Sequence, residues 1–129
     1  QTEPVKIPDA PKGETSHVPL GTLFGARSGD KGGCANLGVW AKDLDAFAFL
    51  SSFLTIEKLK KLMPDLKEFK IERFDLPNIL SLNFYIHDIL EDGVSSNSRK
   101  DAQAKSLGEY LRAKKANIPS SLLETLNEY

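Results

Sequence analysis

The sequence is poor in the residues that build disulfides and metal centres. It holds one cysteine, Cys34, and two histidines, His17 and His87, among its 129 residues. A single thiol excludes an internal disulfide and cannot supply the ligands of an iron–sulfur cluster, and these three residues make no dedicated zinc site. We therefore expect no metal and no other cofactor, and the lack of disulfides favours a reducing compartment.

The sequence also lacks long apolar runs and a strong charge of either sign. Its most apolar stretch, residues 46–56, is much shorter than the roughly 20 residues that cross a bilayer. The formal net charge is -1, which gives no global attraction to nucleic acid or to anionic lipid. The first residues have neither the basic start nor the apolar centre of a secretory signal. We expect a cytoplasmic protein that binds neither membranes nor nucleic acid.

The composition changes near residue 17. Residues 1–16 carry three prolines and a glycine but few apolar side chains, and this composition predicts a flexible tail or linker. Residues 17–129 have the apolar content and the length of one domain with its own core.

The hydrophobic pattern of that domain predicts a mixture of strands and helices. Short strands are expected at residues 18–25, 34–41 and 68–74, with a possible fourth at 94–98. This order of elements predicts an α+β fold, a sandwich of one small, mostly antiparallel sheet with helices packed on one face.

Helices are predicted from apolar spacing and from capping residues. Asp43 and Thr55 are the expected N-caps of two helices, the second of which Pro64 ends. A third helix is expected at residues 78–93, where Ile79, Leu82, Ile86 and Ile89 fall on one helical stripe. A last amphipathic helix is expected at residues 100–116, and a further helical turn or two within residues 118–129.

The glycine-rich segment GARSGDKGG, residues 25–33, is the most unusual part of the sequence. Glycines let successive backbone N–H groups turn toward one point, and such concavities bind anions. Arg27 offers a planar fork for phosphate or carboxylate, Lys31 offers a point charge, and Ser28 offers a hydroxyl. Asp30 could orient either cation or act as a base. The alternative is a hairpin loop whose glycines only satisfy turn geometry, with Arg27 paired to Asp30.

The common nucleotide-binding motifs do not fit this segment. A P-loop has four residues between its glycines, whereas three separate Gly25 from Gly29, and Lys31 follows an aspartate. The dinucleotide fingerprint leads directly into a helix, whereas this segment leads into a predicted strand. No Gly-x-Ser-x-Gly motif of serine hydrolases occurs in the sequence.

Other residues are weaker candidates. His87 could be a general base, although a lone histidine on an apolar helix is more often a hydrogen-bonded boundary residue. Cys34 fits a small residue at the start of a strand better than a nucleophile. Arg99, just before the last predicted helix, could make a second anion contact or could be a solvated helix entry. Asn36 could help His87 to shape the site.

Three segments resemble a known family. LGTLFGARSGDKGGCANLGVWA, FDLPNILSLNFYIHDIL and DAQAKSLGEYL are similar to the small C-terminal ferredoxin-fold domain of the AtuA-like family of acyclic terpene utilisation proteins. The run from Ala26 to Gly33, followed by Asn36 and Gly38, is the specific part of this similarity. The resemblance implies a ferredoxin-like fold for residues 17–129. It also implies a setting in acyl-CoA or terpenoid breakdown, with a larger AtuA-type domain or an acyl-CoA-metabolising enzyme as partner.

Three functions remain open. The first is an accessory or subunit-type domain, expected to form a homo-oligomer, that binds an anionic metabolite, either a CoA thioester or a carboxylate, through the glycine-rich loop with Arg27, Asp30 and Lys31. The second is a small hydratase or lyase acting on an enoyl thioester, with Asp30 or His87 as general base. The third is a purely structural oligomerisation domain. The expected ligand-binding residues are Arg27, Ser28, Gly29, Asp30, Lys31, Gly32, Gly33, Asn36 and Arg99.

Overall fold

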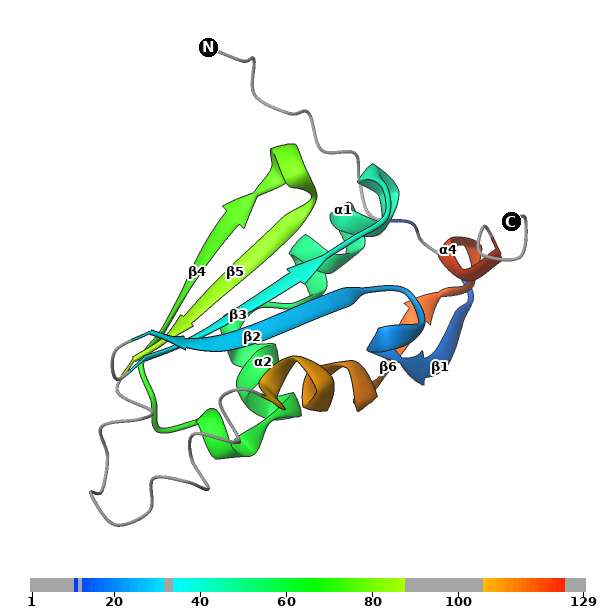
Figure 1. Ribbon diagram of the computed structural model, residues 1–129. Coiled ribbons are helices and arrows are strands. Elements are labelled where there is room, and N and C mark those ends of the chain that lie inside the picture. The colour runs from blue at the N-terminus through cyan, green and yellow to red at the C-terminus, as the bar shows by residue number, and fades with distance from the viewer. Residues whose placement is uncertain (1–10, 12, 32–33, 88–105, 125–129) are drawn as a thin grey trace.

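The computed structural model describes residue 11 and residues 13–31, 34–87 and 106–124. The chain forms an α+β fold with two antiparallel sheets, which confirms the predicted fold class (Figure 1). Along the chain the elements are β1 (Thr15–Pro19), η1 (Leu20–Thr22), β2 (Gly25–Lys31), β3 (Cys34–Trp40), α1 (Leu44–Phe53), α2 (Ile56–Leu62), η2 (Pro64–Leu66), β4 (Ile71–Leu76), η3 (Pro77–Ile79), β5 (Ser81–Ile86), a helix over residues 106–113, β6 (Lys115–Pro119) and α4 (Ser120–Glu124). The large sheet has the order β2-β3-β5-β4, and β1 and β6 form the small sheet.

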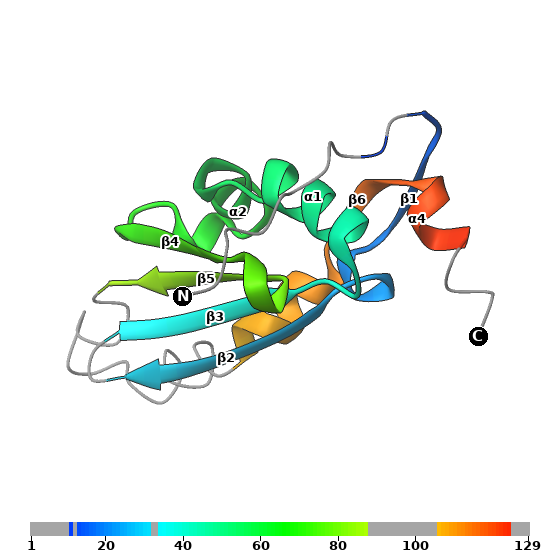
Figure 2. The same ribbon diagram turned by 90° about the horizontal axis from the view of Figure 1, so that it is seen from above.

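Burial alternates along the strands of the large sheet. In β3 and β5 every second residue is buried, because the side chains of a strand point alternately to its two faces. The buried set includes Leu37, Leu82 and Phe84, which pack in one core with the leucines and phenylalanines of α1 and α2. These two helices cover one face of the large sheet (Figure 2).

The other face of the large sheet is called the open face below. It carries Asn36, Gly38 and Trp40 of β3 together with Asn83 and Tyr85 of β5. No helix within the described residues covers it (Figure 2). The residues 106–113 form a helix that runs along β2, and its Leu107 and Leu111 enter the common core.

Both helices with predicted N-caps form as expected. The Asp43 carboxylate accepts a hydrogen bond from the Ala46 amide at 2.9 Å, and the Thr55 hydroxyl accepts one from the Lys58 amide at 3.0 Å. These bonds satisfy amides that have no partner inside the helix. The predicted helical turn near the C-terminus is confirmed as α4.

The helix predicted over residues 78–93 is wrong within the described range. Residues 81–86 form β5, the inner strand between β3 and β4, and a 3₁₀ turn at Pro77–Ile79 precedes it. The apolar residues of SLNFYI fit a helical stripe, but they also alternate strictly, and two neighbouring strands supply backbone partners for the extended form. Leu80, at φ 56°, completes the turn that reverses the chain between β4 and β5.

The ends of the domain also differ from the predictions. The strand expected at residues 18–25 divides into the end of β1, a 3₁₀ turn and the start of β2. β1 begins at Thr15, within the segment expected to be a tail, because it pairs with β6. The helix expected to reach residue 116 ends at 113, since the chain becomes β6 at Lys115. The strand expected at residues 94–98 lies outside the described residues.

In the described part of the chain, every helix is too short or too polar to cross a membrane.

Candidate functional site

The glycine-rich segment is not a loop over most of its length. Residues 25–31 form β2, which pairs with β3 in unbroken register from Gly25 opposite Trp40 to Lys31 opposite Cys34. Successive N–H groups of a strand point in opposite directions, and half of those in β2 face β3. These amides therefore do not converge on one anion, and the predicted glycine cradle is wrong for residues 25–31.

The structure describes some of the predicted site residues with their side chains, some by their backbone alone, and some not at all. Gly32, Gly33 and Arg99 lie outside the described residues, and for Asp30 and Lys31 the structure describes only the strand backbone. Arg27, Ser28, Gly29 and Asn36 come together around a hollow on the open face. This hollow has a volume of about 330 Å³ and is lined by Arg27, Ser28, Gly29, Asn36, Gly38, Trp40 and Asn83.

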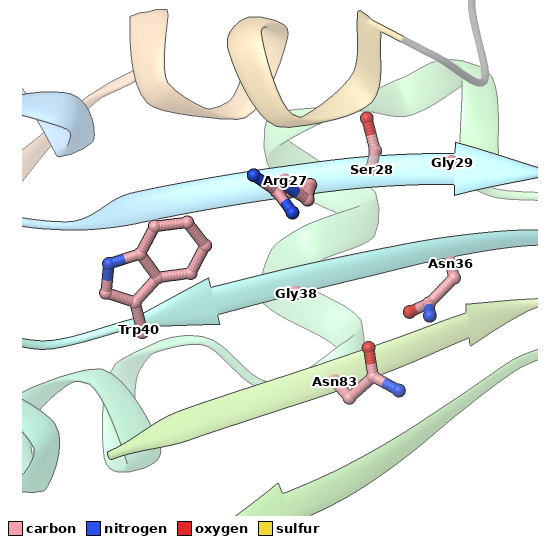
Figure 3. Close-up of a pocket in the computed structure, with 7 residues that line it drawn as sticks. All are labelled: Arg27, Ser28, Gly29, Asn36, Gly38, Trp40 and Asn83. Carbon is pink, nitrogen blue, oxygen red and sulfur yellow. The ribbon is translucent and has the colours of Figure 1, made fainter. Parts of the chain in front are cut away.

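Strand register explains why these residues meet. Arg27 lies opposite Gly38, which lies opposite Asn83, so one row across three strands crosses the hollow. In Figure 3 the side chains of Arg27, Asn36, Trp40 and Asn83 stand on the same side of the sheet. Gly38 has no side chain between them, and this leaves the hollow open.

Ser28 contributes to the hollow differently from the prediction. Its side chain points away from the hollow toward the helix of residues 106–113 (Figure 3). There the Ser28 hydroxyl accepts a hydrogen bond from the Gly108 amide at 2.9 Å. Ser28 thus fixes this helix against β2, and it lines the hollow with its backbone.

Trp40 forms one wall of the hollow and lies across the neighbouring strand. A Cβ atom added to Gly25 would overlap the indole ring, so the absence of a side chain at this position lets Trp40 lie against β2. The indole remains 43% exposed. It offers an apolar surface on which part of a ligand could pack.

The polar groups of the hollow are those of an anion-binding surface. Arg27 is exposed. Among the side chains that the structure describes, none forms an ion pair with Arg27 and no carboxylate lines the hollow. The Oδ1 atom of Asn36 is buried and has no hydrogen-bond partner in the described part of the chain. A buried acceptor without a donor costs free energy unless a ligand or another group supplies one.

A second group of titratable side chains lies on the open face beside the hollow. His87 Nε2 is 3.7 Å from Glu72 Oε1, and the His87 ring meets the Tyr85 ring edge-on with centroids 5.0 Å apart. A side-chain hydrogen bond with Cys34 raises the pKa of Tyr85, and the electrostatic interaction with Cys34, partial burial and the Glu72 carboxylate raise it further. His87 does not line the hollow, so the structure separates it from the predicted ligand-binding residues.

Sequence reasoning missed Gly38, Trp40 and Asn83 as lining residues. The strict alternation of residues 34–40 could have placed Gly38 and Trp40 on the same face as Asn36. The sequence does not indicate Asn83 as a lining residue, because it lies within the helix predicted over residues 78–93 and reaches the hollow only as part of β5. Among the described residues, no group of three or more His, Cys, Asp or Glu side chains could hold a metal ion.

Comparison with known proteins adds one finding. Residues 18–117 match the family model described as the AtuA ferredoxin-like domain. No curated protein and no solved structure matches the chain.

Proposed function

This chain belongs to the AtuA ferredoxin-like domain family, and on that basis we propose that it is an accessory or subunit-type domain that binds an anionic metabolite in the hollow of its open face. The metabolite class that fits best is a carboxylate or a CoA thioester from acyl-CoA or acyclic terpenoid breakdown. A larger AtuA-type domain or an acyl-CoA-metabolising enzyme would be its working partner.

The observation that carries this proposal is the charge distribution of the hollow. Among the side chains that the structure describes, Arg27 is the only charged one that lines it. A guanidinium presents a planar pair of donors that matches a carboxylate or a phosphate, and it remains charged at any physiological pH. An anion in the hollow would meet no carboxylate among the lining side chains that the structure describes.

The other lining groups favour an anion that carries an apolar chain and a hydrogen-bond donor. Trp40 offers an apolar wall, and Gly29 and Gly38 leave a flat floor over which an acyl chain could lie. Asn36 Oδ1 offers an acceptor to a donor on the ligand. A volume of about 330 Å³ is at the lower end of small-molecule sites. A CoA thioester would therefore place only one of its ends in the hollow.

Titration calorimetry with CoA, short acyl-CoAs and free short-chain carboxylates tests the proposal. We expect one of these classes to bind and Arg27→Ala to weaken it at least about tenfold, because a hydrogen bond to a charged group contributes about 1.5 to 3 kcal/mol. Arg27→Lys should retain part of the affinity, since it keeps the charge but loses the fork. Lys61→Ala, an exposed cation of α2, is the control and should bind like the parent protein. No binding, or binding that Arg27→Ala leaves intact, would contradict the proposal.

The hydratase or lyase alternative has less support. Its candidate base His87 lies outside the hollow, and its other candidate, Asp30, is described only by its backbone. A base has to reach the proton that it removes, so a substrate bound in the hollow would be poorly placed for His87.

A further inference from the structure

The open face has more exposed apolar surface than its hollow explains. Phe74 is 49% exposed, and Leu76 and Trp40 are each 43% exposed. Phe74 is paired with Asn83, and Leu76 and Trp40 are both paired with Ser81, so all three side chains share the open face. Exposed apolar patches on a soluble domain commonly mark interaction surfaces.

The register of the four strands arranges this face in three rows. Across β2, β3, β5 and β4, the first row is Gly25, Trp40, Ser81 and Leu76. The second row is Arg27, Gly38, Asn83 and Phe74, and the third row is Gly29, Asn36, Tyr85 and Glu72. The β2 edge is thus mostly glycine, whereas every position on the β4 edge carries a large side chain.

This asymmetry makes the face complementary to itself. When two sheets stack about a two-fold axis that is parallel to the strands, β2 of one copy lies over β4 of the other. Gly29 then faces Glu72, so that a position without a side chain meets a large one in the third row. In the first row the Trp40 indole lies over Gly25, so Leu76 of the second copy meets the indole and two exposed apolar side chains come together. In the inner pair of strands Gly38 faces Asn83. Close packing between stacked sheets requires such interdigitation.

The charges of the face are complementary in the same arrangement. Arg27 lies over Phe74 of the second copy, where a guanidinium and an aromatic ring attract each other. Glu72 of the second copy is one row away, about 7 Å along the strand, which a long side chain can span. Among the side chains that the structure describes, the ion-pair contacts of Glu72 are long, at 4.0 Å to Lys70 Nζ and 3.7 Å to His87 Nε2. None of the side chains that the structure describes forms an ion pair with Arg27.

We infer that two copies of this chain associate through their open faces, with β4 of each copy seated over β2 and the hollow of the other. The second copy and the anionic ligand then compete for one surface, because Asn83 and Phe74 of the second copy fill the space that an acyl group would take. This competition rests on the proposed function, whereas the association itself does not.

The expected association is weak. A sheet of four strands, each about six residues long, measures about 20 Å by 20 Å, which is small for a stable dimer interface. Analytical ultracentrifugation without ligand, over a concentration series that reaches the millimolar range, should show a monomer–dimer equilibrium. A protein that stays monomeric over the whole series would overturn the inference and leave the face to another occupant, such as a larger domain.

Matched substitutions locate the interface. Phe74→Lys places a cation opposite Arg27 of the second copy and should weaken dimerisation at least about tenfold, since like charges in an interface cost several kcal/mol. Tyr110→Lys makes the same kind of change at a side chain that is 54% exposed on the helix of residues 106–113. It should dimerise like the parent protein. Equal effects of the two substitutions, or none from Phe74→Lys, would overturn the inference. Both residues are exposed, and circular dichroism of each variant checks that the fold is kept.

A charge exchange tests the arrangement of the two copies. Arg27→Glu and Glu72→Arg should each weaken dimerisation, and the double variant should recover most of the loss, because the exchanged pair attracts again. A double variant that dimerises no more tightly than the single variants would contradict the arrangement with a two-fold axis parallel to the strands. An anionic ligand that binds in the hollow without shifting the monomer–dimer equilibrium toward monomer would also contradict this arrangement, because the second copy and the ligand should compete for the same surface. A protein that dimerises through Phe74 but binds no anion contradicts the proposed function alone, and one that binds an anion but never dimerises contradicts this inference alone.

Discussion

Gly25 is the residue that lets Trp40 lie against the sheet. A methyl group at this position overlaps the indole, and since the ring is partly exposed, it can swing outward more easily than the strand can move. The hollow therefore depends on the absence of a side chain on the adjacent strand. At Gly29, by contrast, an added Cβ meets nothing within 4 Å.

Intrinsic fluorescence tests this relation directly, because Trp40 is the only tryptophan of the chain. We expect Gly25→Ala to shift the emission maximum to longer wavelength, since the displaced indole gains contact with water. Gly29→Ala, on the same strand and facing open space, should leave the spectrum unchanged. Identical spectra for Gly25→Ala and the parent protein would show that the indole does not rest on β2.

The N-terminus of α1 is stabilised by a carboxylate, so its contribution to the stability of the fold depends on pH. Burial raises the pKa of the Asp43 carboxyl, but the hydrogen bonds from the Lys42 ammonium and the Ala46 amide outweigh it, so that the pKa lies below its usual value. A carboxyl whose pKa is lowered by folding stabilises the fold above its unfolded pKa, near 4. That contribution is lost as the pH falls through the folded value.

Asp43→Ala and Thr55→Ala form a matched pair for this effect. Each removes one N-cap and should cost about 1 kcal/mol of unfolding free energy at neutral pH. As the pH falls below the unfolded pKa near 4 and through the lower folded pKa, the cost of Asp43→Ala should shrink, because the parent carboxyl becomes protonated, whereas the Thr55 hydroxyl does not titrate. Urea denaturation at neutral pH and near pH 3 measures both. A cost of Asp43→Ala that is the same at both pH values would contradict the role of the charged carboxylate.

How far the sequence predicts the elements depends on whether the signal is local. The side chains of Asp43 and Thr55 cap their helices by bonding amides three residues further along the chain, so the starts of α1 and α2 can be predicted from local sequence. The sequence of β5 satisfies both helical and strand periodicity, and what decides between them is its pairing with β3 and β4, which are distant in the chain.

The same holds for the candidate site. The composition of residues 25–33 singles out Arg27 and Gly29, but their conformation follows from pairing with β3 and not from glycine content. Asn83 reaches the hollow only through the β3–β5 register. Charge could thus be located from the sequence, whereas the surface that presents it could not.

The small sheet and the large sheet share one core, and this makes the two sheets one folding unit. Ile118 of β6 is fully buried in the same cluster as Leu37 of β3 and Leu107 of the helix beside β2. Across the small sheet, β1 and β6 pair over five residues and join the start of the described chain to its end. A change in the small sheet should therefore be felt in the large one.

Ile118→Ala tests this coupling. Removal of a fully buried isoleucine side chain should cost about 2 to 5 kcal/mol, because it loses apolar burial and leaves a cavity. Trp40 reports on the large sheet by fluorescence, and far-ultraviolet circular dichroism reports on the whole backbone. Both signals should unfold in one transition, shifted by the same amount. Asn117→Ala, the exposed neighbour that hydrogen-bonds to His17 at 3.0 Å, should cost less than about 1 kcal/mol. If Ile118→Ala lowered the stability seen by circular dichroism but left the Trp40 transition in place, the two sheets would be separate units, and substitutions in the small sheet could not reach the hollow through the core.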